Sequence, residues 1–372
     1  MTNKKRLCII LPTHWSYKLG GSEYQIKCLI ESNLLQEKFN IYLLTKLFKY
    51  EYESNNYHLV SIVKPFFINK YTHFYDAPFL IHKLKKIQPH VIYQNVGTSY
   101  AGFAAYYSKK YNCKMVLHVA SDNDLKPIRR NKLKLCNRKY IEKKMYDYGV
   151  YNSSTLLSQT LYQQRLICKH YDRKSDSVIY NFHPYPQESV NKTYPIKILW
   201  VANLKKLKQP EIFVQLAIDF AKKGLDAEFI MIGSPFSDKK SQQSLEKKMK
   251  GVSQLRYLGQ KNNNEINTIF GYSHILVNTS QYEGFSNTFI QAWMRGVPVV
   301  SLNTDPDGLI ESKRLGYFCN GSYDKLKNSV YELVINDELR EQLSIQSKEF
   351  SLKSFSMHNL DRVAYHISHN VV

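Results

Sequence analysis

The sequence predicts an α/β protein built from two Rossmann-like domains that face each other across a cleft. Three observations lead to this prediction. The chain has 372 residues, strand-like apolar runs alternate with helix-like segments, and the alternation starts again after a break near the middle. A chain of this length exceeds what one core usually accommodates, so two domains are expected. Alternating strands and helices favour parallel sheets covered by helices. We place the domains at residues 1–185 and 186–372.

The first half of the chain contains short apolar runs separated by helix-like segments. The glycine pair Gly20-Gly21 follows the first run, and helices are expected at Glu23–Leu35 and Asp76–Ile87. The predicted strands are Arg6–Leu11, Ile41–Leu44, Leu59–Val63, Val91–Gln94, Lys114–His118 and Ser153–Ser158. Ligands of open parallel sheets bind outside the carboxyl ends of the strands, so the residues that follow these strands are candidates for a binding site.

Two prolines interrupt regular structure within Asn181–Gln187, which marks the boundary between the domains. The strands predicted beyond this break are Ile196–Val201, Glu228–Ile232, Leu255–Tyr257, Ile275–Val277 and Val297–Ser301. Helices are expected at Pro210–Lys223, Ser241–Met249 and Asp361–Ile367, of which the last can pack on either domain.

Composition excludes several classes of protein. With 43% hydrophobic and 22% charged residues, the chain is typical of globular proteins. Its apolar runs are too short to cross a bilayer, so we expect a cytoplasmic protein. The six cysteines are scattered without a close pair, which indicates neither a disulfide framework nor a zinc site.

The net charge of +21 is concentrated in the first half of the chain. Residues 1–190 carry 29 Lys/Arg against 13 Asp/Glu, whereas residues 191–372 carry 23 against 18. The densest run, Lys126–Lys144, has nine basic residues opposed only by Glu142. Such a run is either a solvated helix face or a surface attracted to anions, on the cytoplasmic leaflet or on a nucleic-acid backbone. Charge alone does not distinguish these alternatives.

The segment Gln281–Val300 carries the strongest functional signal in the sequence. It runs from a loop into a helix and then into a buried strand. A helix that starts near Ser286-Asn287-Thr288 directs free backbone N–H groups at whatever lies before it, which favours an anion. Glu283 lies just upstream of that position, and Gln291 follows it two helical turns later. A diphosphate flanked by polyols suits this arrangement, and a nucleotide-sugar is such a ligand.

Three further features follow predicted strands, and each also has a purely structural explanation. Gly20-Gly21 allows close approach of the backbone to a phosphate, although an ordinary glycine turn explains the pair equally well. His118 ends a strand, but a lone histidine is more often structural. Asn203 and the lysines within Lys205–Lys208 either neutralise a pyrophosphate or form a solvated charge run. The sequence contains no metal-binding cluster, nucleophile elbow or Walker loop.

At these residues the sequence resembles glycosyltransferase family 4, the retaining nucleotide-sugar transferases of the GT-B fold. The resemblance covers nearly the whole chain and is most specific between Ile198 and Val300. The family's acid–seven residues–acid motif is matched by Glu283–Gln291, with glutamine in place of the second acid. Gly296–Val300 matches the Gly-x-Pro-Val strand that follows it. Ala202–Lys208 corresponds to the family's Gly-Arg-Leu-x₃-Lys motif.

The resemblance implies a role for each matched residue. Glu283 is expected to contact hydroxyl groups of the donor sugar, and His118 to face the transferred sugar from the N-terminal domain. Lys208 matches the lysine that binds the pyrophosphate. Gln291 stands where an acid usually binds the ribose, so a charge-assisted hydrogen bond is lost there. The remaining donor-binding residues implied are Gly20, Gly21, Asn203, Lys205, Tyr257, Gly284, Phe285, Ser286, Asn287 and Thr288.

The resemblance also implies a mechanism that uses neither a metal ion nor a bound cofactor. The co-substrate is a sugar linked to UDP or GDP. Lys208, Lys205 and the helix amides stabilise the negative charge that develops on the leaving diphosphate. An oxygen of that diphosphate takes the acceptor's proton, and the anomeric configuration is retained.

Three functions are therefore compared. We favour a retaining transferase that acts on a glycan or lipid-linked acceptor in bacterial surface-polysaccharide synthesis, at the inner face of the cytoplasmic membrane. A nucleotide-sugar epimerase or hydrolase on the same fold converts the donor without an acceptor. A nucleic-acid-binding protein is suggested by charge alone, and the missing recognition motifs argue against it. The loops expected to face the acceptor are around Tyr17–Gly21, Tyr100–Phe103 and Ser121–Arg130.

Overall fold

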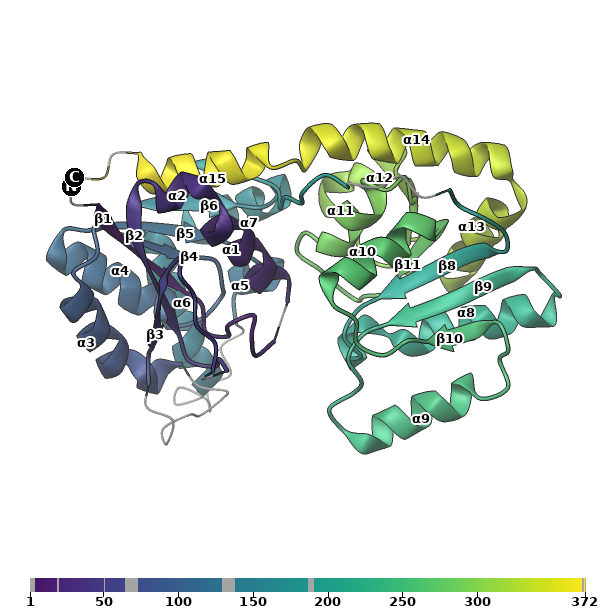
Figure 1. Cartoon of the computed structure of the whole chain (residues 1–372), viewed down its shortest axis with the longest axis horizontal. Coiled ribbons are helices and arrows are strands. Elements are labelled where there is room, and N and C mark those ends of the chain that lie inside the picture. Colours follow the sequence, from purple (N-terminus) through teal and green to yellow (C-terminus); the bar gives the residue numbers. More distant parts are fainter. Residues whose placement is uncertain are drawn as a thin grey trace. The chain divides into compact units, whose positions relative to one another are not determined.

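The chain divides into two compact units, each of which is described here by itself (Figure 1). Unit 1 comprises Met1–Phe182 together with His358–Val372, and unit 2 comprises His183–Met357. The structure is a computed structural model, and it describes residues 4–18, 20–49, 51–63, 73–128, 138–186, 191–369 and 371. Residues 129–137 of the basic run and Leu19 of the first candidate acceptor loop lie outside the described residues.

Unit 1 is built on a parallel sheet in the order β3-β2-β1-β4-β5-β6-β7. Its strands are β1 Lys5–Ile10, β2 Phe39–Thr45, β3 His58–Ser61, β4 Val91–Gln94, β5 Lys114–His118, β6 Thr155–Ser158 and β7 Ser177–Val178. In the central strand, Cys8 lies beside Tyr42 of β2 and Ile92 of β4. The first six strands have the Rossmann order, which confirms the predicted fold of this half of the chain.

The helices of unit 1 depart from the sequence-based expectation in several places. They are α1 Gly21–Glu31, α2 Asn33–Gln36, η2 Phe74–Asp76, α3 Ala77–Ile87, α4 Tyr100–Tyr111, α5 Asp122–Leu125, α6 Arg138–Asn152, α7 Leu161–Tyr171 and α15 His358–Ser368. Of these, α4, α5, α6 and α7 were not predicted. The helix expected over Glu23–Leu35 is interrupted at Ser32, whose backbone is extended (φ −72°, ψ 137°). The hydroxyl of Ser32 donates to the carbonyl of Leu29 at 2.7 Å and so ends α1.

Residues Tyr100–Phe103 were expected to form an acceptor-facing loop, and this expectation is wrong. They form the first turn of α4, and all four are buried. Two glycines bring α4 and α6 into close contact. A Cβ atom on Gly102 would lie 2.1 Å from the carbonyl oxygen of Met145, and one on Gly149 would lie 2.7 Å from Ala101. This close crossing buries the inner face of α4 within the core of unit 1.

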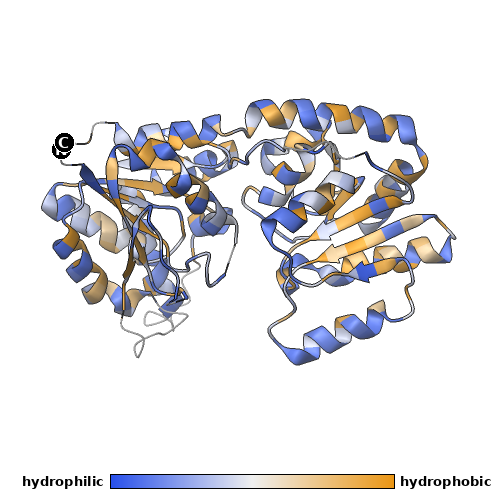
Figure 2. Cartoon of the chain, in the orientation of Figure 1, coloured by the Kyte–Doolittle hydropathy of each residue, from blue (hydrophilic) through white to orange (hydrophobic). Residues whose placement is uncertain are grey.

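Unit 2 repeats the same sheet topology in the order β10-β9-β8-β11-β12-β13, again with parallel strands. Its strands are β8 Ile196–Val201, β9 Ala227–Ile232, β10 Leu255–Tyr257, β11 Ile275–Asn278, β12 Val299–Ser301 and β13 Gly316–Phe318. Figure 2 shows the hydrophobic colouring of β8 and β9, as is typical of strands covered on both faces. The second Rossmann-like unit is thereby confirmed.

Aromatic side chains fill the core of unit 2. The ring of Phe213 lies 5.5 Å from that of Phe229, and the ring of Phe220 lies 5.4 Å from Phe229. Burial of one such side chain contributes about 1.5–3 kcal/mol to stability. The covering helices are η3 Lys206–Lys208, α8 Pro210–Lys222, α9 Lys239–Met249, α10 Asn263–Tyr272, α11 Asn287–Trp293, η4 Pro306–Gly308, α12 Leu309–Ser312, α13 Tyr323–Ile335 and α14 Asp337–Ser354. None of the helices that the structure describes is both long and apolar enough to cross a membrane.

Candidate functional site

Two predicted site residues of unit 2, Lys208 and Glu283, are brought together at the carboxyl edge of its sheet. The ammonium group of Lys208 donates to Oε1 of Glu283, and the two side chains are 20% and 16% exposed. Lys208 lies in η3 after β8, and Glu283 lies in the loop after β11. These strands are neighbours in the sheet, and the loops that follow neighbouring parallel strands meet at one edge.

A buried threonine holds the two loops in register. Thr279 is fully buried, and its hydroxyl accepts from Nε1 of Trp200 at 2.9 Å and donates to the carbonyl of Lys208 at 2.6 Å. The amide of Gln281 donates to the carbonyl of Leu207 at 2.9 Å. These bonds fix the backbone of Lys208 against the strand end that leads to Glu283.

The Glu283 carboxylate has a second partner in its own loop. The hydroxyl of Ser280 donates to the same Oε1 atom at 2.7 Å, and the amide of Ser280 donates to Oδ1 of Asn278 at 3.1 Å. A carboxylate held by an ammonium group and a hydroxyl keeps a defined direction. It can exchange the ammonium group for hydroxyl groups of a polyol, which are also hydrogen-bond donors, while Ser280 stays bound.

Helix α11 begins at Asn287, where the sequence predicts a helix start. Ser286 is its N-cap residue, but the Ser286 side chain makes no capping bond to the helix. Instead, its hydroxyl pairs with the hydroxyl of Thr288 at 2.8 Å. Gly284 leads into this turn, whereas Phe285 is 5% exposed and its ring packs 5.0 Å from that of Phe355. Phe285 therefore anchors the turn, and the hydroxyl pair is the polar part of it.

Gln291 lies on the side of α11 that faces α10. It is 6% exposed, and its Nε2 donates to Oδ1 of Asn267 at 2.9 Å. Its backbone carbonyl accepts from Arg295 at 3.2 Å. Asn267 was missed by the sequence analysis, because nothing in the order of residues indicates which helix lies opposite Gln291.

A second polar group lies after β8 and β9. The hydroxyl of Ser234 donates to Oδ1 of Asn203 at 2.5 Å, while Lys205 is exposed. Gly233 ends β9 so close to β8 that a Cβ atom there would lie 1.7 Å from the carbonyl oxygen of Ala202. The hydroxyl of Tyr257 donates to the carbonyl of Gly233 at 2.8 Å. Tyr257 thereby braces the loop after β9, whose Ser234 contacts Asn203.

In unit 1, Gly20 is the N-cap of α1 and Gly21 its first residue. A Cβ atom on Gly20 would lie 2.5 Å from Oε2 of Glu23, so the glycine leaves room for that carboxylate. His118 is the last residue of β5, and it is 3% exposed. Its Nδ1 lies 3.1 Å from the hydroxyl of Tyr93. Burial lowers the pKa of His118 to about 4, so the imidazole is neutral at pH 7.

Further buried polar groups follow the strands of unit 1 at the same edge as His118. Gln94 ends β4 and Asn95 follows it, Ser99 precedes α4, and Gln159 follows β6; each is at most 3% exposed. Among the described residues, the side-chain oxygens of these four have no hydrogen-bond partner. Buried polar atoms are normally paired, so such a group marks a place for water or a polar ligand. The sequence analysis did not single out these four residues, although their positions after predicted strands could have indicated them.

A buried ion pair lies near this edge and was also missed. Nζ of Lys46, after β2, donates to Oδ2 of Asp76 at 2.6 Å, and the hydroxyl of Tyr100 donates to the same oxygen at 2.5 Å. Burial raises the pKa of Asp76, but hydrogen bonds from His73, Lys46 and Tyr100 outweigh it, so the net shift is downward. Asp76 is therefore ionised, and it ties η2 and α4 to the end of β2.

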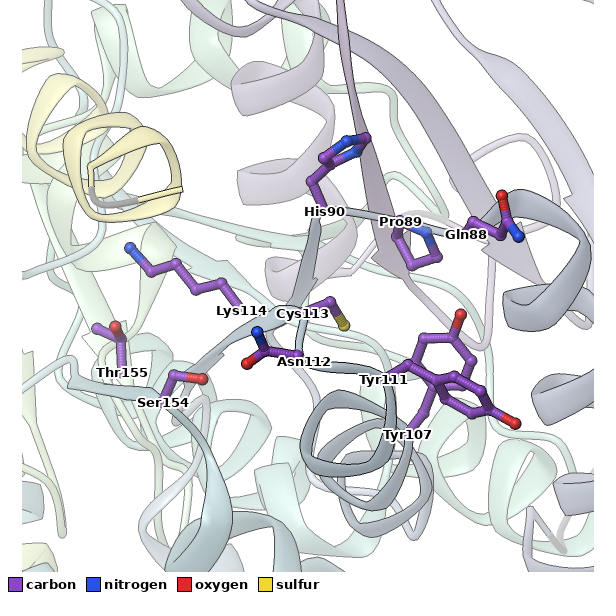
Figure 3. A pocket seen from close by; sticks show the side chains of 10 residues that line it. All are labelled: Gln88, Pro89, His90, Tyr107, Tyr111, Asn112, Cys113, Lys114, Ser154 and Thr155. Carbon is purple, nitrogen blue, oxygen red and sulfur yellow. The ribbon is translucent and has the colours of Figure 1, made fainter. Parts of the chain in front are cut away.

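One cavity of about 600 Å³ opens at the opposite, amino-terminal edge of the unit 1 sheet (Figure 3). His90, Cys113, Lys114 and Thr155, which lie at or just before the first residues of β4, β5 and β6, are among its lining residues. The Lys114 ammonium already donates to the carbonyls of His366 and His369 at 2.6 and 2.5 Å. Because ligands of such sheets bind at the carboxyl edge, we do not assign the predicted site to this cavity.

The chain is similar to known proteins in sequence and in fold. Residues 182–350 match the family model described as glycosyl transferases group 1. Over 150 residues the chain is 32% identical to an uncharacterized glycosyltransferase, MJ1178, of Methanocaldococcus jannaschii; the match covers 39% of this chain and 41% of that protein. The chain thus matches about two fifths of the length of this relative.

Among solved structures, WaaG, a glycosyltransferase involved in lipopolysaccharide biosynthesis, has a TM-score of 0.78 at 11% identity, covering 98% of this chain and 100% of that one. HepE of Anabaena, solved in complex with UDP, has a TM-score of 0.74 at 14% identity, with 98% and 99% covered. At these identities the likeness shows the fold, which is that of GT-B glycosyltransferases. In sequence, residues 182–350 resemble glycosyltransferases.

Proposed function

We propose that this protein is a retaining glycosyltransferase that moves a sugar from a nucleotide-sugar donor to a glycan or lipid-linked acceptor. The observation that carries the proposal is the Lys208–Glu283 pair, held by buried hydrogen bonds after β8 and β11 and followed by the polar turn at Ser286. At this pair, a cation that can bind a diphosphate (Lys208) lies beside a carboxylate that can bind sugar hydroxyls (Glu283). HepE, which shares the fold, binds UDP, so a UDP- or GDP-linked sugar is the donor we propose.

In this proposal Lys208 exchanges Glu283 for the diphosphate when the donor binds. Glu283 then accepts hydrogen bonds from the sugar's hydroxyl groups, for which Ser280 keeps it oriented. The Ser286–Thr288 hydroxyl pair and the first amides of α11 bind phosphate oxygens. Asn203 and Lys205 contribute polar contacts to the donor. Gln291 contacts the ribose, and the backbone around Tyr257 contacts the base.

The proposed reaction breaks the bond between the anomeric carbon and the diphosphate oxygen. The acceptor's hydroxyl oxygen forms the new bond on the same face of the sugar, and its proton passes to an oxygen of the leaving diphosphate. Lys208 stabilises the negative charge that develops on that group, and no protein nucleophile or metal ion takes part. His118, which is neutral at pH 7, is the proposed hydrogen-bond partner of the transferred sugar, and Gly20 and Gly21 are proposed to let the backbone approach a phosphate.

Unit 1 is the proposed acceptor side. The unpaired oxygens of Gln94, Asn95, Ser99 and Gln159 suit a ligand rich in hydroxyl groups, since each can accept a hydrogen bond. A lipid-linked acceptor in surface-polysaccharide synthesis is a ligand of this kind. The strongly basic first half of the chain supports contact with the anionic inner face of the membrane.

Two measurements test the proposal. In a thermal-shift screen with UDP- and GDP-sugars, a ligand that binds only the folded state raises the midpoint. The donor that does so is then assayed for sugar transfer to candidate acceptors. Replacing Glu283 by alanine should abolish most of the turnover, whereas replacing the exposed Glu349 by alanine should leave it unchanged.

Three outcomes contradict the proposal. Full activity of the Glu283→Ala variant removes the assigned site. Conversion of the donor at equal rates with and without acceptor favours an epimerase or hydrolase on the same fold. An inverted anomeric centre in the product, detected by NMR, excludes the same-face reaction.

A further inference from the structure

We propose that the cavity at the amino-terminal edge of the unit 1 sheet is a binding site for a neutral carbohydrate. We call it the amino-edge cavity (Figure 3), and its lining includes Tyr107, Tyr111, Asn112, Lys114, Ser154 and Thr155. Its volume of about 600 Å³ lies within the range of about 300–1,000 Å³ that small-molecule sites occupy. The inference concerns a site of its own and does not rest on the proposed sugar transfer.

The amino-edge cavity is separate from the carboxyl edge of the same sheet, where His118 lies. Strand β5 connects the two edges, with Lys114 as its first residue and His118 as its last. A strand rises about 3.3 Å per residue, so the Cα atoms of these two residues are roughly 13 Å apart. A ligand in the amino-edge cavity is therefore held at a different place from one bound beside His118.

Three helices end beside the amino-edge cavity. Gln88 and Asn112 are the C-cap residues of α3 and α4, each with a left-handed backbone (φ 49°), and Ser154 follows the end of α6 by two residues. The last carbonyl groups of a helix have no partner within it, and they carry partial negative charge. Three such ends together disfavour an anion and favour a ligand that donates hydrogen bonds.

The charged groups around the cavity do not favour an ionic ligand. In the described part of the chain no Asp or Glu lines it, so a cation has no carboxylate to pair with. The Lys114 ammonium is satisfied by the carbonyls of His366 and His369 at 2.6 and 2.5 Å, at the end of α15. Burial lowers the pKa of His90, so this ring is neutral at pH 7. The ligand that fits is uncharged.

The polar side chains of the cavity can both donate and accept hydrogen bonds. Asn112 contributes an amide, and Tyr111 and Thr155 contribute hydroxyl groups; within the described ranges these three side chains form no hydrogen bond. The hydroxyl of Ser154 accepts from the amide of Met115 at 3.0 Å, which leaves its own proton for a ligand. Sugar hydroxyls also donate and accept at once, so they match this set.

Two tyrosine rings form an apolar side of the cavity. The rings of Tyr107 and Tyr111 lie 4.5 Å apart with 32° between their planes. Tyr107 is fixed, because its hydroxyl donates to the carbonyl of Leu84 at 3.0 Å, whereas Tyr111 is 43% exposed. In Figure 3 both rings lie on the side of the cavity away from Ser154 and Thr155. This arrangement fits a sugar, whose C–H groups pack on aromatic rings while its hydroxyl groups bind polar side chains.

Binding of sugars of different charge to the full chain tests the proposal. Saturation-transfer NMR measures the affinity for methyl α-glucoside, methyl α-galactoside and maltotriose. Glucuronate and glucosamine serve as an anion and a cation of similar size, at a pH at which the amine of glucosamine is protonated. We expect at least one neutral sugar to bind, and both charged sugars to bind roughly ten-fold more weakly, because neither charge finds a partner in the cavity.

Two matched pairs of variants locate the bound sugar. Asn112→Gly removes the amide but keeps a residue that tolerates the left-handed backbone, and Asn320→Gly makes the same change at an exposed position of unit 2 (φ 46°). Tyr111→Ala removes a lining ring. Tyr106→Ala removes an exposed ring of α4 outside the lining, and the two rings lie 6.0 and 5.9 Å from Nζ of Lys110. We expect binding roughly five-fold weaker for Asn112→Gly, as for one lost hydrogen bond. For Tyr111→Ala we expect it to be roughly ten-fold weaker, with both controls unchanged.

Alkylation of the native cysteines gives a second readout of the binding place. Cys113 lines the cavity, and Cys168 in α7 is exposed. Burial raises the pKa of Cys113 to about 11, so its modification by iodoacetamide is slow and is followed at alkaline pH, peptide by peptide. We expect the sugar that binds most tightly to slow modification of Cys113 and to leave that of Cys168 unchanged.

The proposal is overturned if no neutral sugar binds, if a charged sugar binds as tightly as the neutral ones, or if Asn112→Gly and Tyr111→Ala bind like their controls. Tighter binding of maltotriose than of methyl α-glucoside identifies the ligand as part of a glycan chain, and equal binding identifies it as a free sugar; both outcomes support the site. The thermal shift produced by a nucleotide-sugar is measured on the same variants. We expect it to be unchanged, so that a failure at the cavity is distinguishable from a failure of the proposed transferase function.

Discussion

The Lys208 ammonium group offers the sharpest test of how unit 2 works. We predict that Lys208→Met lowers kcat roughly 10²–10³-fold while the fold is retained. When a nucleoside diphosphate leaves, it gains one negative charge. A unit charge about 4 Å from that site is worth about 4 kcal/mol at an effective dielectric constant of about 20, which corresponds to roughly three powers of ten in rate. The Lys208 side chain is 20% exposed, so solvent screening lowers the effect towards the smaller figure.

Lys208→Met should change the free energy of unfolding much less than it changes the activation free energy of sugar transfer. Lys208 pairs with Glu283 in the structure, and both side chains are partly exposed. Such a pair contributes about 1 kcal/mol or less to the free energy of unfolding. Glu283 also keeps the hydroxyl of Ser280 as a donor at 2.7 Å. The variant should therefore unfold near the temperature of the unaltered protein.

The assay measures donor turnover on an acceptor at saturating donor concentration, beside chemical denaturation of each variant. Lys206→Met is the matched control, because Lys206 lies in the same 3-10 helix but is exposed. A Lys208→Met variant within a factor of about three of the control in kcat would refute the assignment. So would a loss of activity that is matched by a loss of several kcal/mol in the free energy of unfolding.

Four other predictions follow from particular contacts. Gln291→Leu removes the bond to Asn267 at 2.9 Å and should cost about 1 kcal/mol of stability. It should also reduce the thermal shift produced by a nucleotide, whereas an unchanged shift argues against a ribose contact. Burial holds the pKa of His118 at about 4 in the folded state against 6.5 for the exposed side chain, so the unfolded state binds the proton first. The free energy of unfolding is then highest above pH 6.5 and falls as the pH drops towards 4. His118→Phe should flatten this dependence by up to about 1.4 kcal/mol per pH unit, as measured by denaturation at several pH values. Lys114→Met removes both bonds to the end of α15 and should speed amide exchange in α15 but not in unit 2. Gly102→Ala places a Cβ atom 2.1 Å from the carbonyl oxygen of Met145 and should cost about 1–3 kcal/mol in denaturation; a variant as stable as the unaltered protein contradicts the tight packing of α4 on α6.

The central strands were predictable because they are short apolar runs buried on both faces of a parallel sheet, whereas the edge strands β7 and β13 were not predicted. The predicted bounds of Val91–Gln94, Lys114–His118 and Ile196–Val201 are those of β4, β5 and β8. Helix α4 was not predicted, for a related reason. Its residues Tyr100–Ala105 are all buried, so they lack the polar stripe by which a surface helix is recognised in a sequence.

The site residues also fall into those that the sequence could place and those that it could not. Glu283, Lys208 and the Ser286 turn lie in loops after predicted strands, so their placement at a carboxyl edge could be inferred from the sequence. The ion pair between Lys46 and Asp76 could not, because it joins residues 30 positions apart whose segments have no motif of their own. The pairing of Gln291 with Asn267 depends on how α10 packs against α11, which no local pattern specifies.

The sequence by itself determined most of the strands in both halves, some of the helices and the turn at which α11 begins. Apolar runs and capping preferences act over a few residues, and a sequence displays them directly. Only the tertiary structure decided that Lys208 meets Glu283 across 75 residues. The reason is the order of the strands: β9 and β10 intervene along the chain, yet β11 pairs with β8. That adjacency is set by how the whole sheet buries its apolar surface, and it brings a cation and a carboxylate together at one edge.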